Sequence, residues 1–388
     1  MRTGDSDKKT ITAILEDFLA PCRQRVALGT ERQLRYFAHE KPDAWPIRIA
    51  ADSQTLERVQ AAIPSVAPED TAREFFRILL ESLRVTAGRL TTNSDWAPSF
   101  FPAYGCGVSM TALGLKQKRE HGTYGAYGPP DALPQEQALA LSLDDVRIRG
   151  DFKRRLELIG YARAMLDDEL PILCSYTAGP LSFACELMGA DFMMLTASDP
   201  DEAHRFLDFC TDAIGKILGW LREAAGADAC ANTPLGSQSI VRGAKAMQVD
   251  DDHAVMFSPQ AIDEYVIPSV CELSRRCGLS IGTLHYCGWH AHLSRAITRE
   301  QSIRAFNNNP IPQKAHAAPF DEVMRWCAET GTIYNGYWPK QEAETLKAYL
   351  KRLHAWAERG LLFPEIPSFP DLEGFASAAE MADYWYQL

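Results

Sequence analysis

The sequence has no long hydrophobic run. Among its 388 residues, no apolar stretch approaches the roughly 20 residues that a helix needs to cross a bilayer. The opening residues, Met1-Arg-Thr-Gly-Asp-Ser-Asp7, are polar and have no apolar core behind them, so they predict no signal peptide. These two absences predict a cytoplasmic protein that has no membrane partner.

The sequence is also short of positive charge. It has 40 Lys and Arg residues against 51 Asp and Glu residues, which gives a formal net charge of −11. Nucleic acids and anionic membranes attract proteins mainly through a basic surface. The basic runs at 116–119 and 153–155 are too short to provide one. The charge balance therefore argues against a nucleic-acid partner.

The ten cysteines do not form a closely spaced framework. In a chain of this length without an export signal, scattered cysteines are expected to be reduced thiols. Several lie within amphipathic helical patterns, where cysteine acts as a small core residue. With 46% hydrophobic and 23% charged residues, the chain has an ordinary globular composition that supports a large core.

What the sequence does contain, from about residue 150 onward, is a regular alternation of helical and strand patterns. Amphipathic or Pro-initiated segments predict helices at 152–166, 180–187, 199–221, 259–276, 320–330, 342–358 and 377–386. Short apolar runs between them predict strands at 171–175, 227–231, 279–284, 303–306, 332–334 and 361–363. Strands that alternate with helices pair in parallel through right-handed crossovers. The number of units favours a barrel, although an open doubly wound sheet has the same local pattern.

The organisation of the whole chain follows from this alternation. We predict an α/β protein in which residues 1–388 form a single (β/α)8 TIM barrel, with residues 1–40 as an N-terminal helical extension. Residues 116–145 differ from the rest, because glycines and prolines interrupt every periodic pattern there. We predict that this segment is an irregular surface excursion or a lid.

Several apolar runs end in, or just before, a polar residue. In a barrel, the carboxyl ends of all strands meet at one mouth, where active sites are built. Asn and Asp also favour ordinary turns, so each of these residues has a structural interpretation as well. As a set they predict a polar pocket formed by Asp95, Tyr176, Asn232, His285, Asn307, Asn335 and Glu365.

The sharpest local feature is the sequence Leu284-His285-Tyr286-Cys287-Gly288, directly after a predicted strand. Side chains alternate along a strand, so His285 and Cys287 point to the same side and can reach one ion. An imidazole nitrogen and a thiolate sulfur are typical zinc ligands. A single H-x-C pair also fits a half-buried histidine beside a core cysteine, and both interpretations remain open at this point.

With this motif in place, the chain resembles the uroporphyrinogen decarboxylase superfamily. The resemblance extends over most of the chain from about residue 30, with 116–145 outside it, and implies a single (β/α)8 barrel. The matching segments are Lys41-Pro-Asp-Ala-Trp-Pro-Ile47, Asp95-Trp-Ala-Pro98, Gly105-Cys-Gly107, Gly179-Pro-Leu181, Asp199-Pro200, Phe257-Ser-Pro259 and His285-Tyr-Cys-Gly288.

The resemblance implies two possible chemistries, and the H-x-C pair favours the branch of zinc-dependent methyltransferases. Those enzymes exchange a methyl group between a small thiol or ether substrate and a corrinoid (cobalamin) carried by a partner protein. His285 and Cys287 match two of the branch's zinc ligands, but the cysteine expected near the last strand is absent. Glu365 lies in that closing segment, and a carboxylate binds zinc, so we predict it as the third ligand. Asp95, Tyr176, Asn232, Asn307 and Asn335 would then orient the substrate.

Other residues of the chain are alternative candidates for metal ligands. A related variant of the family uses acidic residues upstream of the histidine, where this chain has Glu264 and the run Asp250-Asp-Asp252. We interpret Glu264 as part of a solvated helix face and the Asp run as a helix N-terminal cluster. Cys106 and Cys174 are alternative ligands, although single cysteines are more often small hydrophobic residues.

The rival chemistry is decarboxylation without a cofactor. The resemblance implies that true decarboxylases hold a carboxylate-rich tetrapyrrole with an arginine-rich loop after the first strand. Arg32 and Arg35 precede that strand on a predicted helix, and only Arg48 follows it closely. Binding many carboxylates requires several fixed cations, so this reaction is disfavoured. A barrel that binds a tetrapyrrole or corrinoid without catalysis is the remaining alternative.

Overall fold

The computed structural model describes most of the chain and positions the residues discussed below. The described residues are 5–50, 71–90, 92–102, 107–119, 127–128, 131–166, 169–173, 176–226, 230–232, 241–242, 246–309, 320–336, 338–369 and 371–388. Cys106 and Cys174 lie outside these ranges. None of the described helices has the length and apolar character required to cross a membrane.

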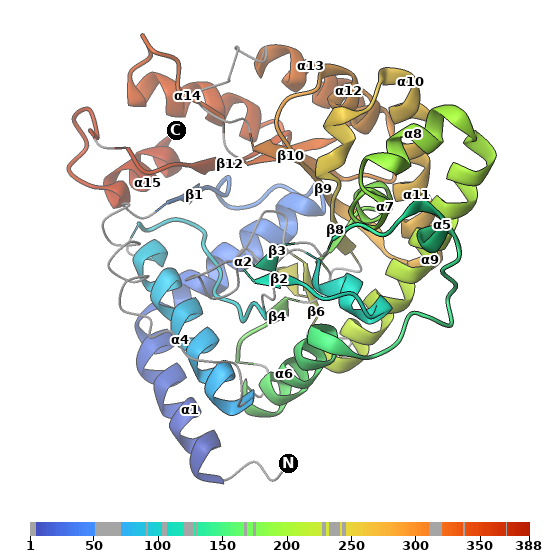
Figure 1. Ribbon diagram of the computed structural model, residues 1–388. Coiled ribbons are helices and arrows are strands. Elements are labelled where there is room, and N and C mark those ends of the chain that lie inside the picture. Colours follow the sequence, from blue (N-terminus) through green and yellow to red (C-terminus); the bar gives the residue numbers. More distant parts are fainter. Residues whose placement is uncertain are drawn as a thin grey trace.

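A parallel sheet of seven strands forms the centre of the molecule (Figure 1). Its order is β1-β12-β11-β10-β9-β8-β5. From β8 to β12, strands that follow one another in the sequence are therefore neighbours in the sheet. The strands are β1 (Arg48–Ile49), β5 (Tyr176–Ala178), β8 (Ala246–Asp250), β9 (Ser280–Cys287), β10 (Ala305–Asn309), β11 (Ile333–Gly336) and β12 (Leu362–Ile366). A second sheet contains β4 (Ile172–Leu173), β6 (Cys230–Asn232) and β7 (Val241–Arg242).

Backbone hydrogen bonds connect residues 95–100 to the start of β1 and to β4. The Asp95 N–H donates to the Ile47 carbonyl at 2.8 Å, beside β1. Five residues later, the Phe100 N–H donates to the Pro171 carbonyl at 2.9 Å, and Phe100 bridges in parallel to Ile172 of β4. The segment between Asp95 and Phe100 therefore connects the start of β1 to β4 of the second sheet. The parallel strands and the helices around them confirm the predicted α/β fold class.

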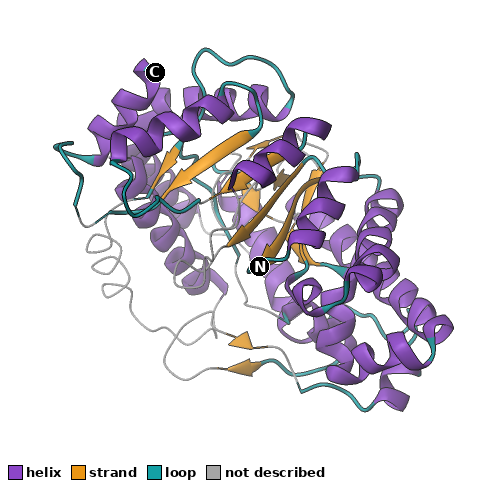
Figure 2. Ribbon diagram, turned by 90° about the horizontal axis from the view of Figure 1, so that it is seen from above, coloured by secondary structure: helices purple, strands orange, loops and turns teal. Residues whose placement is uncertain are grey.

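Helices surround the strands, as Figure 2 shows from above. They are α1 (Asp5–Leu19), α2 (Arg23–Phe37), α4 (Thr71–Leu90), α5 (Gln135–Leu139), α6 (Gly150–Leu166), α7 (Pro180–Met188), α8 (Ala190–Ser198), α9 (Pro200–Ala225), α10 (Pro259–Ala261), α11 (Ile267–Cys277), α12 (Ala291–Arg299), α13 (Phe320–Thr330), α14 (Leu346–Ala357) and α15 (Ala378–Gln387). A π-helical turn, Ile262–Val266, joins α10 to α11.

Local capping sets where several of these helices begin. The Asp199 carboxylate accepts the Glu202 N–H at 3.1 Å, and Pro200 occupies the first turn of α9. Ser258 and Ser377 cap α10 and α15 in the same way, each through its hydroxyl oxygen. Such caps satisfy backbone N–H groups that have no partner within the helix. These starts follow from the sequence alone, and the predicted helix positions agree with the observed ones.

The N-terminal helices form the predicted extension and pack against the barrel. On α2, the Tyr36 ring lies 6.0 Å from the ring of Phe363, and the Phe37 ring lies 5.9 Å from it, centroid to centroid. Phe363 belongs to β12 and is fully buried. The extension therefore buries aromatic surface of the barrel instead of projecting away from it.

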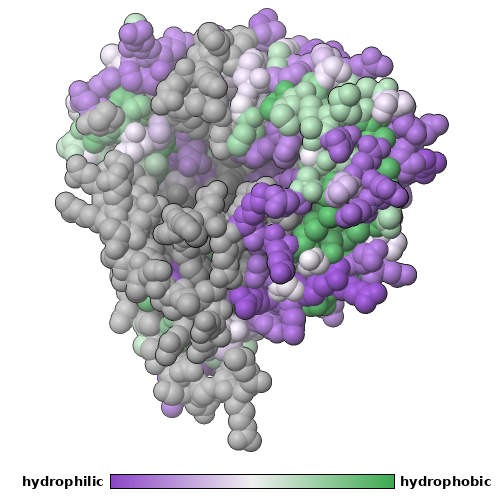
Figure 3. Space-filling model, viewed as in Figure 1, coloured by the Kyte–Doolittle hydropathy of each residue, from purple (hydrophilic) through white to green (hydrophobic). Residues whose placement is uncertain are grey.

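The segment 116–145 is more ordered than predicted where the structure describes it. It contains the two-stranded antiparallel pair β2 (Lys118–Arg119) and β3 (Tyr127–Gly128), and then helix α5. The Leu133 N–H donates to the carbonyl of Leu187 on α7 at 2.7 Å. Apolar side chains gather in Figure 3 on the side of the molecule where Figure 1 shows α5, α8 and α9. The later part of this segment is thus anchored to the body, and its role as a lid stays a prediction.

Candidate metal centre at the barrel mouth

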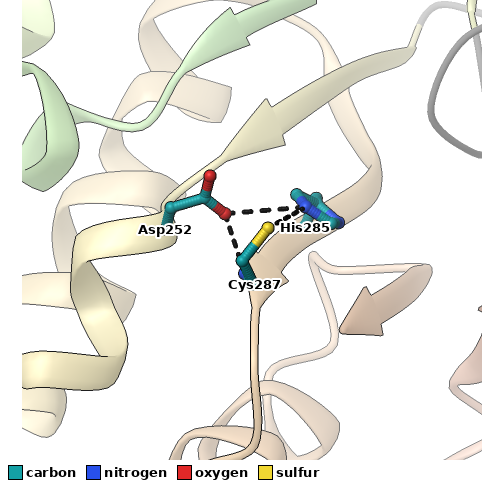
Figure 4. Close-up of side chains that lie close together, drawn as sticks. All are labelled: Asp252, His285 and Cys287. Carbon is teal, nitrogen blue, oxygen red and sulfur yellow. Dashed lines mark hydrogen bonds and ion pairs between the residues drawn. The ribbon is translucent and has the colours of Figure 1, made fainter. Parts of the chain in front are cut away.

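Three potential metal-ligating side chains converge at the carboxyl ends of β8 and β9 (Figure 4). The Nε2 atom of His285 lies 3.4 Å from the Cys287 sulfur and 3.5 Å from a carboxylate oxygen of Asp252. One ligand atom from each residue lies within 4.8 Å of the other two. The carboxyl ends of barrel strands form the mouth at which active sites are built.

The pairing of β8 with β9 produces this convergence. Asp250, the last residue of β8, stands in register with His285. Beyond it, the Asp251 N–H donates to the His285 carbonyl at 2.8 Å, and the Cys287 N–H donates to the Asp252 carboxylate at 2.8 Å. These two hydrogen bonds hold the chain after β8 against the end of β9, so that Asp252 faces the two ligands on β9.

The local sequence of β9 sets the positions of the other two ligands. Alternation along the strand places His285 and Cys287 on one side, with His285 buried and Cys287 exposed. Gly288 follows with a φ of +103°, a backbone conformation that other residues adopt at a cost. The strand therefore ends in a turn directly after the second ligand.

The donor set suits a zinc ion. It combines an imidazole nitrogen, a thiol sulfur and a carboxylate oxygen, which are the three ligand types that zinc binds in proteins. Three protein ligands leave the fourth tetrahedral position open, as in catalytic zinc sites. The other ring nitrogen of His285, Nδ1, contacts the side-chain oxygen of Asn307, so Nε2 remains directed at the group. The residues present thus fit the metal that the sequence analysis predicted.

Further acidic residues lie beside the group. Burial raises the pKa of Asp251 to about 7, although the Ser182 N–H donates to its carboxylate at 2.7 Å. Burial also raises the pKa of Glu186 on α7 to about 7, and the charges of Asp252 and Asp251 add to the effect. A side chain at Gly179 would lie 2.4 Å from the Asp251 carboxylate, which explains the glycine before α7. The surroundings of the group favour a cation.

The structure does not bring Glu365 into this group. Among the described residues, the donor atoms that lie together belong to Asp252, His285 and Cys287. Glu365 lies on β12, in register with Arg48 on β1, and its carboxylate is 3.4 Å from the Arg48 guanidinium. Strands β10 and β11 separate β12 from β9. In this structure Glu365 is an ion-pair partner of Arg48, and Asp252 is the residue that lies beside His285 and Cys287. Glu365 as a metal ligand stays a prediction.

The other acidic residues were partly interpreted correctly. The Asp run does begin a short 3-10 helix, Asp252–Met256, but the Asp252 side chain turns toward β9. Glu264 lies in the π-helical turn, and its carboxylate is 3.4 Å from Nε2 of His204 on α9. This position on outer helices agrees with the interpretation of Glu264 as part of a helix face.

Asp95 lies beside the start of β1, where its N–H donates to the Ile47 carbonyl at 2.8 Å, and residues 95–99 form no strand. Its fully buried carboxylate accepts hydrogen bonds from Arg32 at 3.2 Å, and from the Tyr386 hydroxyl at 2.7 Å. Burial raises the pKa of Asp95, against the lowering effect of Tyr386 and Arg32. Asp95 therefore ties α2 and α15 to the base of the barrel.

Replacing Asp95 by alanine is expected to lower the free energy of unfolding by about 3–5 kcal/mol, because it leaves the buried Arg32 guanidinium short of a counter-charge. Chemical denaturation measures this change. Asp43 also pairs with Arg32 but is exposed, so Asp43→Ala serves as the control and costs at most about 1 kcal/mol. The interpretation fails if Asp95→Ala leaves stability unchanged while metal binding is lost.

The four remaining residues of the predicted pocket lie on strands. Asn307 contacts His285, and Asn335 donates to the Thr283 hydroxyl at 3.0 Å, deeper in the barrel than His285. Tyr176 begins β5 and Asn232 ends β6, and the description of both is limited to their backbone. The structure thus brings Asn307 to the metal group, and the roles of the other three stay predictions.

Arg32 and Arg35 lie on helix α2, as expected for residues that do not form a substrate-binding loop. Arg32 pairs with Asp43 and Asp95, and Arg35 pairs with Glu31. Arg48 is fully buried between the rings of Trp96 and Phe363 and pairs with Glu365. Each of these arginines has a carboxylate partner within the protein.

Comparisons with known proteins support the fold. A protein-family model described as uroporphyrinogen decarboxylase (URO-D) matches residues 104–237. This match includes residues 116–145, which the sequence analysis placed outside the resemblance, so that boundary was wrong. No curated protein matches the sequence significantly.

A methyltransferase from Methanosarcina mazei superimposes with a TM-score of 0.59 at 17% identity, covering 92% of this chain and 98% of that one. At this identity the similarity establishes a shared fold. A malate synthase from Haloferax volcanii, in a lead(II) complex, reaches a TM-score of 0.28 at 8% identity, over 66% of this chain and 69% of its own, which is too low to support an argument.

Proposed function

We propose that the chain belongs to the uroporphyrinogen decarboxylase superfamily and that it is a zinc-dependent methyltransferase. It would move a methyl group between a small thiol or ether substrate and a corrinoid carried by a partner protein. The observation that carries the proposal is the convergence of Asp252, His285 and Cys287 at the barrel mouth. The fold shared with the Methanosarcina mazei methyltransferase supports the same reaction class.

The chain's own residues prepare a site for the ion and the substrate. Asp252 and Cys287 are exposed residues, while His285 is buried. A substrate heteroatom entering from the mouth would therefore take the remaining ligand position. Zinc bound there would act as a Lewis acid toward that heteroatom and depress the pKa of a substrate thiol.

Neighbouring residues would hold and orient the substrate. We keep Tyr176, Asn232 and Asn335 as proposed substrate-orienting residues; Tyr176 and Asn335 lie on strands of the main sheet, and Asn232 ends β6 of the second sheet. The acidic neighbours Glu186 and Asp251 disfavour a substrate with an additional negative charge close to the ion. This expectation separates neutral thiols and ethers from the carboxylate-rich substrates of true decarboxylases.

The proposal is tested by zinc removal and restoration. The purified protein is assayed with methylcobalamin and a set of simple thiols and methyl ethers, before and after treatment with a zinc chelator. Demethylation or methylation of cobalamin, followed by its visible absorbance, is expected to fall to background without zinc and to return when zinc is added. Activity that survives chelation, with no zinc bound beforehand, contradicts the proposal.

The matched family model's description favours one second candidate, a cofactor-free decarboxylase. That reaction would release carbon dioxide from a tetrapyrrole carboxylate and would not respond to a chelator. The pairing of Arg32 and Arg48 with carboxylates of the protein weighs against it, because neither guanidinium is left to bind a substrate carboxylate alone. A non-catalytic tetrapyrrole-binding barrel is distinguished by binding without turnover in the same assays.

A further inference from the structure

Asn307, the residue beside His285 on the next strand, is not one of the three candidate metal ligands. Asn307 on β10 stands in register with His285 on β9, and its side chain is almost fully buried at 2% exposure. Its side-chain oxygen contacts Nδ1 of the imidazole ring. An amide oxygen only accepts hydrogen bonds, so the contact requires the proton of the ring to be on Nδ1.

The tautomer decides which ring nitrogen can bind an ion. With the proton on Nδ1, the lone pair of a neutral imidazole is on Nε2. Nε2 is the nitrogen that lies 3.4 Å from the Cys287 sulfur and 3.5 Å from the Asp252 carboxylate. The Asn307 contact thus directs the free lone pair of His285 toward the other two ligands.

The strand that carries Asn307 is itself fixed at this point. The next residue, Asn308, donates to the Gly288 carbonyl at 2.9 Å, in the turn that follows Cys287. Its own side-chain oxygen accepts the Tyr334 hydroxyl at 2.8 Å, which sets the orientation of the amide. Strand β10 therefore contacts β9 at both ends of the ligand pair, and Asn307 has a rigid support.

An amide also suits the charge of the site. The Cys287 thiolate and the Asp252 carboxylate would together balance the charge of a divalent ion. Asparagine orients the ring through its amide oxygen without adding a further charge.

From these contacts we propose that Asn307 is a positioning residue for the metal centre, acting through His285. The proposal rests on the zinc site proposed above and replaces the predicted contact of Asn307 with substrate. Removing the acceptor frees the ring to rotate, which moves Nε2 away from the other ligands, or to change tautomer, which puts the proton on Nε2. Either change removes the free lone pair from the group. Loss of such an outer partner typically weakens metal binding by about 10–100-fold.

The test is the zinc dissociation constant, measured by competition with a chromogenic chelator for the wild type and three variants. Asn307→Leu, similar in size but without an acceptor, is expected to bind zinc about 10–100-fold more weakly. Asn307→Asp keeps an acceptor at the same position and is expected to bind within a few fold of the wild type. Asn335→Leu is the matched control, because it removes a fully buried amide that contacts Thr283 instead of His285.

The outcomes separate the inference from the proposed function. If Asn307→Leu binds zinc as tightly as the wild type, or weakens it only as much as Asn335→Leu, the inference is overturned and the zinc site stands. If the wild type binds no zinc, both fail. Should Asn307→Leu not fold, a loss of zinc affinity in Asn307→Asp of the same size would also overturn the inference, because that variant keeps the acceptor. The unfolding temperatures of the metal-free proteins show whether stability alone has changed.

Discussion

Replacing Cys287 by serine is expected to remove bound zinc from the protein and to abolish methyl transfer. The serine hydroxyl stays protonated near neutral pH and is a poor substitute for a thiolate ligand. Only two donors of the group, His285 and Asp252, would remain. Replacing a residue that only hydrogen-bonds to a metal ligand weakens metal binding by about 10–100-fold. Replacing a ligand itself is therefore expected to weaken zinc binding by more than about 100-fold.

Elemental analysis of the purified proteins measures this effect. The wild type is expected to hold about one zinc per chain, and Cys287→Ser much less. Cys277→Ser is the matched control, because Cys277 is a partly buried cysteine at the end of α11, outside the metal group. Equal zinc contents in the wild type and Cys287→Ser would rule out the thiol as a ligand.

The second large effect concerns the third ligand. Asp252→Asn is expected to lose zinc, because the change removes the carboxylate charge while keeping an oxygen that can accept the Cys287 N–H. Glu365→Gln is expected to retain zinc, because the Glu365 carboxylate faces Arg48. The Glu365 variant should instead unfold at a lower temperature, since the fully buried Arg48 loses its counter-charge.

Asp252→Asn and Glu365→Gln distinguish the two assignments of the third ligand, because only the variant that removes the true ligand is expected to lose zinc. Zinc affinity by chelator competition and the unfolding temperature of the metal-free protein are measured for both. Loss of zinc in Glu365→Gln with retention in Asp252→Asn would restore the assignment made from the sequence. Loss in both would indicate that Glu365 moves to the ion when it binds.

The fold was largely predictable because its signals are local. The helix predicted at 320–330 is observed as Phe320–Thr330, and that predicted at 377–386 as Ala378–Gln387. Periodic apolar residues and capping residues act within a few positions, so the sequence contains them directly. Strand β10 extends past the predicted end at 306 to Asn309, because its mouth-facing residues are asparagines and give no apolar pattern.

The proximity of two candidate ligands could be predicted where both lie on one strand. His285 and Cys287 are two positions apart on β9, and strand alternation is enough to bring them together. The partners of Asp95 could not be predicted from the sequence, because Arg32, Ile47 and Tyr386 are distant from it along the chain.

Asp252 could have been found from the same principle that placed the other mouth residues. It lies two positions after the end of β8, and His285 and Cys287 lie at the end of the neighbouring strand β9. However, three consecutive aspartates are also typical of a helix start. Glu365 was chosen over it by position along the chain. In the sheet, β10 and β11 lie between β9 and β12, the strand that carries Glu365.

The sequence by itself thus determined the alternating α/β architecture and the His285–Cys287 pair, because helix periodicity, caps and strand alternation operate over a few residues. Only the tertiary structure decided the third donor and the partner of the histidine ring. Asp252 and Asn307 reach His285 from the two strands that flank β9, through pairings between distant segments of the chain. Strand order and register depend on how the whole sheet packs its side chains, and no local pattern contains that information.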